Sequence, residues 1–212
     1  MKSIVILISG RGSNMAALLT AQVGARVAAV VSNAPGAAGL GVAQAAGIAT
    51  AVVDHRAYPG RPEFEAALAA EIDRHAPDLV VLAGFMRILT PAFIGRFEGR
   101  LLNIHPSLLP AFPGLHTHQR ALDSGNRIHG CTVHFVTADL DAGPIVVQAA
   151  VPVLSSDTED TLAARVLEQE HRIFPAAVRW FCEGRVRLEY GRARVEGART
   201  GAVALVSPAL DA

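Results

Sequence analysis

The sequence predicts an α/β protein built on a doubly wound, mostly parallel sheet with helices on both faces. Over the first hundred residues, short apolar runs rich in Val and Ile alternate with helical patterns, as in consecutive strand–helix–strand units. These runs are continuously apolar, which is typical of parallel strands buried on both faces. The chain has 212 residues, 51% of them apolar, and this suffices for one domain with a full core.

The parallel part follows from five apolar runs and the patterns between them. Strands are expected at residues 3–9, 26–33, 51–54, 78–83 and 101–104. Helices are expected at residues 15–21, 40–46, 61–75 and 90–97. Phe64, Leu68 and Ile72 recur at a spacing of four, so they share one face of the third helix. Thr90 is suited to cap the fourth helix, with Pro91 at its first position.

The second half of the chain changes character. A proline-rich loop at 106–114 leads to a short helix at 117–123. Strands expected at 132–136 and 145–153 flank a tight turn at 139–143. A long helix follows at 157–183, where Pro175 favours a bend. The last expected element is a hairpin at 185–195 that turns at Gly191.

Composition excludes several classes of protein. Lys and Arg total 19 and Asp and Glu total 19, so the formal net charge is zero and no general nucleic-acid-binding surface is expected. Cys131 and Cys182 form neither a disulfide framework nor a CxxC metal motif. No apolar run is long enough to span a membrane, and no cleavage pattern follows the N-terminal run. We therefore expect a soluble, cytoplasmic protein with no membrane partner.

The turn Gly-Arg-Gly-Ser-Asn at 10–14 is the first candidate site. It follows the first strand and opens the first helix, where backbone N–H groups and the helix dipole favour an anion. No Gly-Lys-Ser/Thr follows, so this is not a Walker A loop, and Met15 stands where a dinucleotide motif needs its third glycine. The motif alone is equally compatible with a bound phosphate and with an unliganded tight turn.

Asn103 and His105 form the second candidate site. Alternate residues of a strand project from one face, and this pair ends a parallel strand, where open α/β sheets place their sites. An amide donor beside an imidazole is suited to stabilising an oxyanion.

The acidic turn at 139–143 is the third candidate, and it can orient a base, bind a cation or simply turn the chain. His116 and His118 have no acid or cysteine cluster at ligand spacing, so no metal site is expected. His55, His75 and His129 are expected to be ordinary surface residues. The residues alone leave the reaction open.

Five segments carry the clearest motifs: residues 8–14 (ISGRGSN), 82–89 (LAGFMRIL), 102–110 (LNIHPSLLP), 111–118 (AFPGLHTH) and 134–144 (HFVTADLDAGP). Together they resemble the folate-dependent formyltransferases, specifically the phosphoribosylglycinamide formyltransferase family of purine biosynthesis. The resemblance extends from about residue 3 to residue 184. It implies a Rossmann-like formyltransferase fold. It also implies formyl transfer from 10-formyltetrahydrofolate, as co-substrate, to the amine of glycinamide ribonucleotide.

The resemblance also implies roles for individual residues. Those that match the catalytic trio are Asn103, His105 and Asp141. Those that match the glycinamide ribonucleotide site are Gly12, Ser13, Asn14, Met15, Gln169 and Glu170. Those that match the folate site are Arg61, Met86, Arg87, Ile88, Leu89, Asn103, Thr137, Ala138, Asp139, Leu140 and Asp141. Leu167 departs from the polar residue that relatives often carry. A cis Leu109–Pro110 bond is also implied.

The implied organisation is a single formyltransferase domain over residues 1–212. It consists of a phosphate- or nucleotide-binding half at 1–100, a catalytic and folate-binding half at 101–184 and a C-terminal tail at 185–212. No metal is expected, and the protein is expected to be a monomer or a weak homodimer.

The implied chemistry is direct attack of the amine on the formyl carbon, through a tetrahedral intermediate. Asn103 and His105 would stabilise the oxyanion, while Asp141 favours the charged imidazole and holds a water that relays a proton. One alternative is a formyltransferase for another amine, such as methionyl-tRNA, which the turn at 10–14 and the zero net charge disfavour. The other is a non-catalytic nucleotide-binding module, which accounts for that turn but not for the trio.

Overall fold

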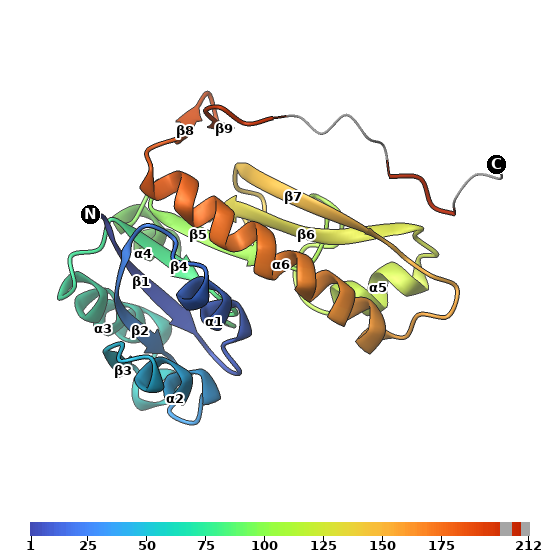
Figure 1. Cartoon of the computed structure of the whole chain (residues 1–212). Coiled ribbons are helices and arrows are strands. Elements are labelled where there is room, and N and C mark those ends of the chain that lie inside the picture. Colours follow the sequence, from blue (N-terminus) through green and yellow to red (C-terminus); the bar gives the residue numbers. More distant parts are fainter. Residues whose placement is uncertain (200–204, 209–212) are drawn as a thin grey trace.

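The computed structural model describes residues 1–199 and 205–208, and a seven-stranded sheet carries the fold (Figure 1). Its strands are β1 (Ser3–Ile8), β2 (Arg26–Ser32), β3 (Thr50–Val52), β4 (Leu79–Leu82), β5 (Leu101–His105), β6 (Ile128–Phe135) and β7 (Ile145–Pro152). They lie in the order β3-β2-β1-β4-β5-β6-β7. The first five pair in parallel, and β6 and β7 add antiparallel. The predicted doubly wound, mostly parallel sheet is confirmed.

Helices cover both faces of the sheet (Figure 1). They are α1 (Ser13–Thr20), α2 (Ala38–Ala45), the short 3-10 helix η1 (His55–Ala57), α3 (Arg61–Asp73), α4 (Pro91–Arg96), α5 (Thr117–Asp123) and α6 (Glu159–Cys182). Apolar residues of α1, α2, α5 and α6 pack on one face, and those of α3 and α4 pack on the other.

Strand β1 shows why its apolar run is continuous. Ile4, Ile6 and Ile8 point to the face covered by α1 and α6, whereas Val5 and Leu7 point to the face covered by α3 and α4. All five side chains are fully buried. A strand in the middle of a parallel sheet has no solvent face, so both sets of alternate positions are apolar.

Several element boundaries differ from the predicted ones. Helix α1 begins at Ser13, so Ser13 and Asn14 belong to its first turn and not to the preceding loop. Strand β6 begins at Ile128, four residues earlier than expected. Helix α6 continues through Pro175. The side chain of Thr90 caps α4 by accepting a hydrogen bond from the N–H of Phe93, as predicted.

The C-terminal tail opens with the expected hairpin. Its strands are β8 (Val186–Glu189) and β9 (Arg192–Val195), joined through Tyr190 and Gly191. Residues 200–204 and 209–212 of the predicted tail lie outside the described residues. No helix in the described part of the chain is both long and apolar enough to cross a membrane.

The strand order identifies one edge of the sheet as the place for a site. From β1 the chain builds outward to β2 and β3, then returns to add β4 on the opposite side of β1. Such a reversal leaves an opening at the carboxyl ends of the two adjacent strands, and open α/β proteins bind ligands there. The segments that follow β1, β4 and β5 all leave the sheet at this edge.

Candidate active site

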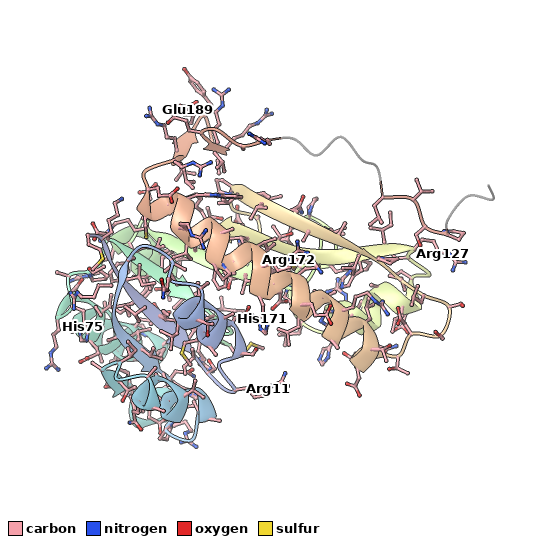
Figure 2. All side chains as sticks on the ribbon, in the orientation of Figure 1. Arg11, His75, Arg127, His171, Arg172 and Glu189 are labelled. Carbon is pink, nitrogen blue, oxygen red and sulfur yellow. The ribbon has the colours of Figure 1, made fainter. Side chains whose placement is uncertain are left out.

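The turn between β1 and α1 depends on a glycine. Gly12 has a φ of 74°, and a Cβ placed on it would lie 2.8 Å from the Cα of Gly39. A side chain at this position would therefore meet both a strained backbone and the start of α2. Figure 2 shows Arg11 at the outer end of this turn.

The first turn of α1 has backbone N–H groups that find no acceptor within the described residues. No side chain caps this helix, and the N–H groups of Ser13, Asn14 and Met15 donate to no acceptor within the described residues. The first N–H groups of a helix lack intrahelical acceptors and attract anions. The Met15 side chain is fully buried, so only its backbone can contact a ligand.

Asn14 links α1 to α6. Its Nδ2 donates to Glu170 Oε2 at 2.6 Å, although 156 positions separate the two residues. Burial raises the pKa of Glu170, and the hydrogen bond from Asn14 works against this shift. Asn14 Oδ1 is buried with no partner in the described structure. The neighbouring Gln169 is half-buried and accepts from Arg172 at 2.8 Å.

The loop after β4 exposes apolar side chains on an anchored backbone. Met86 is 64% exposed and Ile88 is 59% exposed, whereas Leu89 is buried. The buried carboxylate of Glu65, on α3, accepts hydrogen bonds from both the N–H and the hydroxyl of Thr90, where the loop ends.

Two arginines are predicted to bind folate, one on α3 and one in this loop. Arg61 stands four positions before Glu65, so the two residues share one side of α3, and Arg61 is exposed at the start of the helix. Arg87 lies within the loop and is half-buried. Within the described residues, no hydrogen bond or ion pair joins Arg61 to the loop.

His105 and Asp141 meet across the site. His105 Nδ1 lies 3.4 Å from Asp141 Oδ2, and the two side chains are only 7% and 10% exposed. His105 Nε2 lies 2.9 Å from the carbonyl oxygen of Phe112, to which an Nε2–H donates. The N–H of Gly114 donates to Asp141 Oδ2 at 2.8 Å. Both ring nitrogens therefore have partners, and His105 can donate to a substrate only if Nε2–H leaves Phe112.

Asn103 is oriented by a second buried histidine. Its Nδ2 lies 3.2 Å from His134 Nε2, and His134 Nδ1 lies 2.9 Å from the carbonyl oxygen of Phe135. Burial lowers the pKa of His134, which keeps the ring neutral. A neutral ring that donates through Nδ1 must accept through Nε2. Asn103 therefore donates one N–H to His134, and its second N–H can donate to a ligand.

Asp141 owes its position to the turn after β6. It adopts a left-handed conformation with a φ of 52°, which few residues other than glycine and Asn or Asp tolerate. Gly143 closes the turn, where a Cβ would lie 1.8 Å from the carbonyl oxygen of Phe135. Thr137 donates to the Asp139 carbonyl at 3.3 Å. Ala138, Asp139 and Leu140 are exposed.

Side chains of the antiparallel strands β6 and β7 hold the loop after β5 in place. Thr132 Oγ1 donates to the carbonyl oxygen of Ser107 at 2.7 Å and accepts from the N–H of Leu109 at 3.0 Å. Gln148 Nε2 donates to the Leu109 carbonyl at 2.9 Å. The Leu109–Pro110 peptide bond is cis, as predicted.

The expectation that His129 lies at the surface is wrong. It is 1% exposed, its Nε2 lies 3.2 Å from His118 Nδ1, and its ring packs edge-on against Phe112. Burial and the neighbouring His118 lower the pKa of His129 to about 4. Among the described residues, no three His, Cys, Asp or Glu side chains gather as metal ligands.

Comparison with known protein families finds a match over most of the chain. The model of the formyl transferase family matches residues 2–178. The chain belongs to the formyl transferase family. It is 51% identical over 201 residues to a phosphoribosylglycinamide formyltransferase of Escherichia coli strain K12, which covers 93% of this chain and 95% of that relative.

Solved structures agree with this membership. A glycinamide ribonucleotide transformylase 1 from Symbiobacterium toebii superposes with a TM-score of 0.90 at 49% identity, covering 92% of this chain and 94% of that one. A phosphoribosylglycinamide formyltransferase from Coxiella burnetii gives a TM-score of 0.89 at 45% identity, with the same coverage of 92% and 94%.

Sequence reasoning missed the residues that support this formyl transferase site. His134 and Thr132 stand directly opposite Asn103 and His105 in the antiparallel register. A sequence signal for them exists, since polar Thr132 and His134 alternate with apolar Val133 in the strand. Glu65 gives no such signal, because its partner Thr90 lies 25 residues away and joins it only through the tertiary structure.

Proposed function

We propose that this formyl transferase moves a formyl group from 10-formyltetrahydrofolate to the amine of glycinamide ribonucleotide, as a step of purine biosynthesis. The observation that carries the proposal is the cluster of Asn103, His105, Asp141 and His134 at the carboxyl end of β5. An uncapped helix start, suited to a phosphate, opens at the same edge of the sheet.

The phosphate of the ribonucleotide would bind at the first turn of α1. Gly12, Ser13, Asn14 and Met15 provide backbone N–H groups there, without a competing acceptor from the described residues. Glu170 lies 2.6 Å from Asn14 and, with Gln169, extends this site along α6. Their carboxylate and amide oxygens are suited to accept hydrogen bonds from the amine end of the substrate.

The folate site would draw on both halves of the chain. Met86, Arg87, Ile88 and Leu89 follow β4, and the segment 137–141 follows β6. Exposed apolar side chains of both segments would cover the ring system, and exposed Arg61 would meet the negatively charged glutamate tail. The 1–100 half would thus hold the phosphate and contribute to the folate site, with the catalytic trio in the 101–184 half.

In the reaction, the neutral amine nitrogen attacks the formyl carbon and the carbonyl oxygen becomes an oxyanion. The free N–H of Asn103 donates to that oxygen, and a protonated His105 lowers the energy of the negative charge. Asp141, 3.4 Å from His105, stabilises the imidazolium. The amine then loses a proton, the bond from carbon to the folate nitrogen breaks, and that nitrogen takes up a proton. Tetrahydrofolate leaves.

We infer that the enzyme works in the cytoplasm as a single domain, either as a monomer or as a weak homodimer, without nucleic-acid or membrane partners. No metal enters any step, because Asn103 and His105 provide the electrophilic groups.

The test is formyl transfer by the purified protein, with glycinamide ribonucleotide and methionyl-tRNA offered in parallel. We expect transfer to the ribonucleotide only, followed by the absorbance change of the folate. His105→Asn should abolish it, and His75→Asn, at a half-buried histidine beside Glu71, should not. Transfer to methionyl-tRNA, or no transfer to either amine, would overturn the proposal.

A further inference from the structure

Ser9, the residue that follows β1, is bonded to the loop after β4 through both its backbone and its side chain. Its N–H donates to the carbonyl oxygen of Gly84 at 3.1 Å. Its Oγ accepts from the N–H of Met86 at 2.7 Å, and its hydroxyl hydrogen is donated to Asn33 Oδ1 at 2.5 Å. Because that single hydrogen is committed to Asn33, the hydroxyl supports the loop and does not donate to a ligand.

Asn33 is held in turn by a third strand end. It follows β2 and is only 3% exposed. His55 Nδ1, in η1, lies 2.9 Å from the Asn33 carbonyl oxygen and 3.1 Å from its Nδ2. An Nδ1–H that donates to the carbonyl oxygen cannot also accept from Nδ2, so His55 holds the backbone of Asn33, while the Ser9 hydroxyl is the partner of its Oδ1. Residues after β1, β2 and β3 thus converge on one N–H group of the loop that follows β4.

The middle of the loop needs such an anchor, because only its flanking side chains, Phe85 and Leu89, are buried. Met86 and Ile88 are both more than half exposed, so apolar packing contributes little to holding this stretch of backbone. Its far end is bonded to the buried carboxylate of Glu65 through Thr90. A backbone anchored at both ends, with apolar side chains directed outward, is a preorganised surface for a flat apolar ring and lowers the entropy cost of binding it.

We propose that Ser9, supported by Asn33, is a positioning residue that fixes the loop after β4 for folate binding. The inference rests on the proposed function, since it takes residues 86–89 as part of the folate site. Ser9 makes no hydrogen bond to Asn103, His105 or Asp141 within the described structure. Its loss should therefore weaken folate binding and leave the chemical step unchanged.

The test compares Ser9→Ala with Ser9→Thr, which restores a hydroxyl. Ser9→Ala should raise the folate KM about 5- to 10-fold, the effect of losing one supporting hydrogen bond. The turnover number and the KM for glycinamide ribonucleotide should stay within about twofold. Ser9→Thr should return the folate KM to within about twofold of the wild-type value. Thr20→Ala, which removes an exposed hydroxyl on α1 bonded to the Ala16 carbonyl, is the control and should change neither KM.

Two further measurements separate positioning from a general loss of structure. The Met86 N–H should exchange with deuterium about tenfold faster in Ser9→Ala, while the amides of β5 exchange at the wild-type rate. His55→Ala removes the support of Asn33 together with an edge-on contact to Phe64, and should shift the folate KM in the same direction by about twofold.

The outcomes distinguish this inference from the proposed function. If the wild-type enzyme formylates glycinamide ribonucleotide and Ser9→Ala leaves the folate KM unchanged, Ser9 has no positioning role and the function stands. The role is also wrong if Ser9→Ala changes the turnover number and both KM values alike. If calorimetry finds no binding of tetrahydrofolate to the wild-type protein, both the proposed function and this inference fail.

Discussion

Two parts of the sheet build their portions of the site from different chemical groups: the parallel part, strands β1 to β4, and the antiparallel part, the pairs that β6 forms with β5 and β7. Strand β5 is also paired in parallel with β4, and it is counted with the antiparallel part. In the parallel part, the turn after β1 offers backbone N–H groups, and its shape depends on Gly12. In the antiparallel part, the catalytic portion of the site consists of buried and half-buried side chains. His105, His129 and His134 are all buried, whereas His55 and His75 of the parallel part are half-buried.

This difference has consequences for what each part tolerates. Backbone donors carry no titratable charge, so the turn after β1 should respond to changes of shape and not to changes of pH. Buried imidazoles and carboxylates respond to charge, because a low-dielectric surrounding amplifies electrostatic interactions. Substitutions that alter charge without shape, or shape without charge, therefore test the comparison directly.

The largest effect is expected from Asp141→Asn, which keeps the shape of the side chain and removes its charge. The imidazolium of His105 would lose the carboxylate that lies 3.4 Å from Nδ1. We expect the turnover number to fall at least ~100-fold, the usual scale for losing an acid–base or oxyanion group. Dissociation constants for both substrates should change much less, because the lost interaction belongs to the transition state.

Asp139→Asn is the matched control for this substitution. Asp139 is an exposed acid of the same turn, so its loss removes an equal charge at almost the same place in the chain. Its turnover number should remain within about threefold of the wild-type value, since exposed charges are screened. Equal turnover numbers for Asp141→Asn and the wild type would show that His105 works without this carboxylate.

Gly12→Ala tests the parallel part by changing shape without charge. The added Cβ would lie 2.8 Å from the Cα of Gly39, at a φ of 74°. We expect the KM for glycinamide ribonucleotide to rise about 10-fold or more, and the free energy of unfolding to fall by about 1–3 kcal/mol. Steady-state kinetics and urea unfolding provide the two values.

Gly10→Ala offers the comparison for that experiment. Gly10 belongs to the same turn, yet a Cβ placed on it meets no atom within 4 Å, and its φ is not in the positive range. It should behave like the wild type in both assays. If Gly12→Ala also behaves like the wild type, the turn does not depend on its backbone geometry and the contrast with the antiparallel part disappears.

In the antiparallel part, the buried His129 should make stability depend on pH. The pKa of His129 is lowered to about 4 in the folded protein, whereas an unfolded histidine titrates near 6.5. The folded state thus binds fewer protons between these values. The stability that this difference provides is complete above pH 6.5 and is lost as the pH falls from 6.5 towards 4. We expect a loss of about 1–2 kcal/mol between pH 7 and pH 5.

Urea unfolding at pH 7, 6 and 5 measures this loss. His129→Phe keeps an aromatic ring against Phe112 but cannot titrate, so its stability should fall less steeply over that interval. His75→Gln removes a half-buried histidine of the parallel part, which lies 3.2 Å from Glu71, and should retain the wild-type slope. An unchanged slope in His129→Phe would assign the pH dependence to other groups.

The same contrast explains how much of the molecule could be predicted from its sequence. The parallel strands were predictable because each carries a continuous apolar run, and burial on both faces requires one. The start of β6 was not, since Ile128, His129 and Gly130 resemble a loop when read alone. His129 is buried only because His118 and Phe112 lie against it, and such neighbours arise from the tertiary structure.

The catalytic side chains also differ in how far the sequence alone identifies them. Alternation within one strand identified Asn103 and His105, because neighbours in the sequence determine which face they share. Asp141 was placed with them only by resemblance to a family, since 36 positions separate it from His105. His134 was missed, because finding it requires the register that sets Asn103 opposite it.

The smallest effect is expected from Arg61→Ala, at the exposed start of α3. Arg61 would meet the glutamate tail of the folate at the rim of the site, and exposed ion pairs contribute little to binding. We expect the folate KM to rise about 3- to 5-fold while the turnover number stays within about twofold, because a rim contact binds ground and transition states alike.

A folate analogue without the glutamate tail distinguishes this contact from any other effect of Arg61. Wild type and Arg61→Ala should bind that analogue equally, and the difference between them for the natural co-substrate should shrink at high salt. Arg74→Ala, at the opposite end of α3 where Arg74 pairs with Glu71, should leave every KM unchanged. A turnover number that collapses in Arg61→Ala with the folate KM unchanged would move Arg61 from the rim into the chemistry. The parallel part would then contribute a charged side chain to catalysis, and its contrast with the antiparallel part would no longer hold.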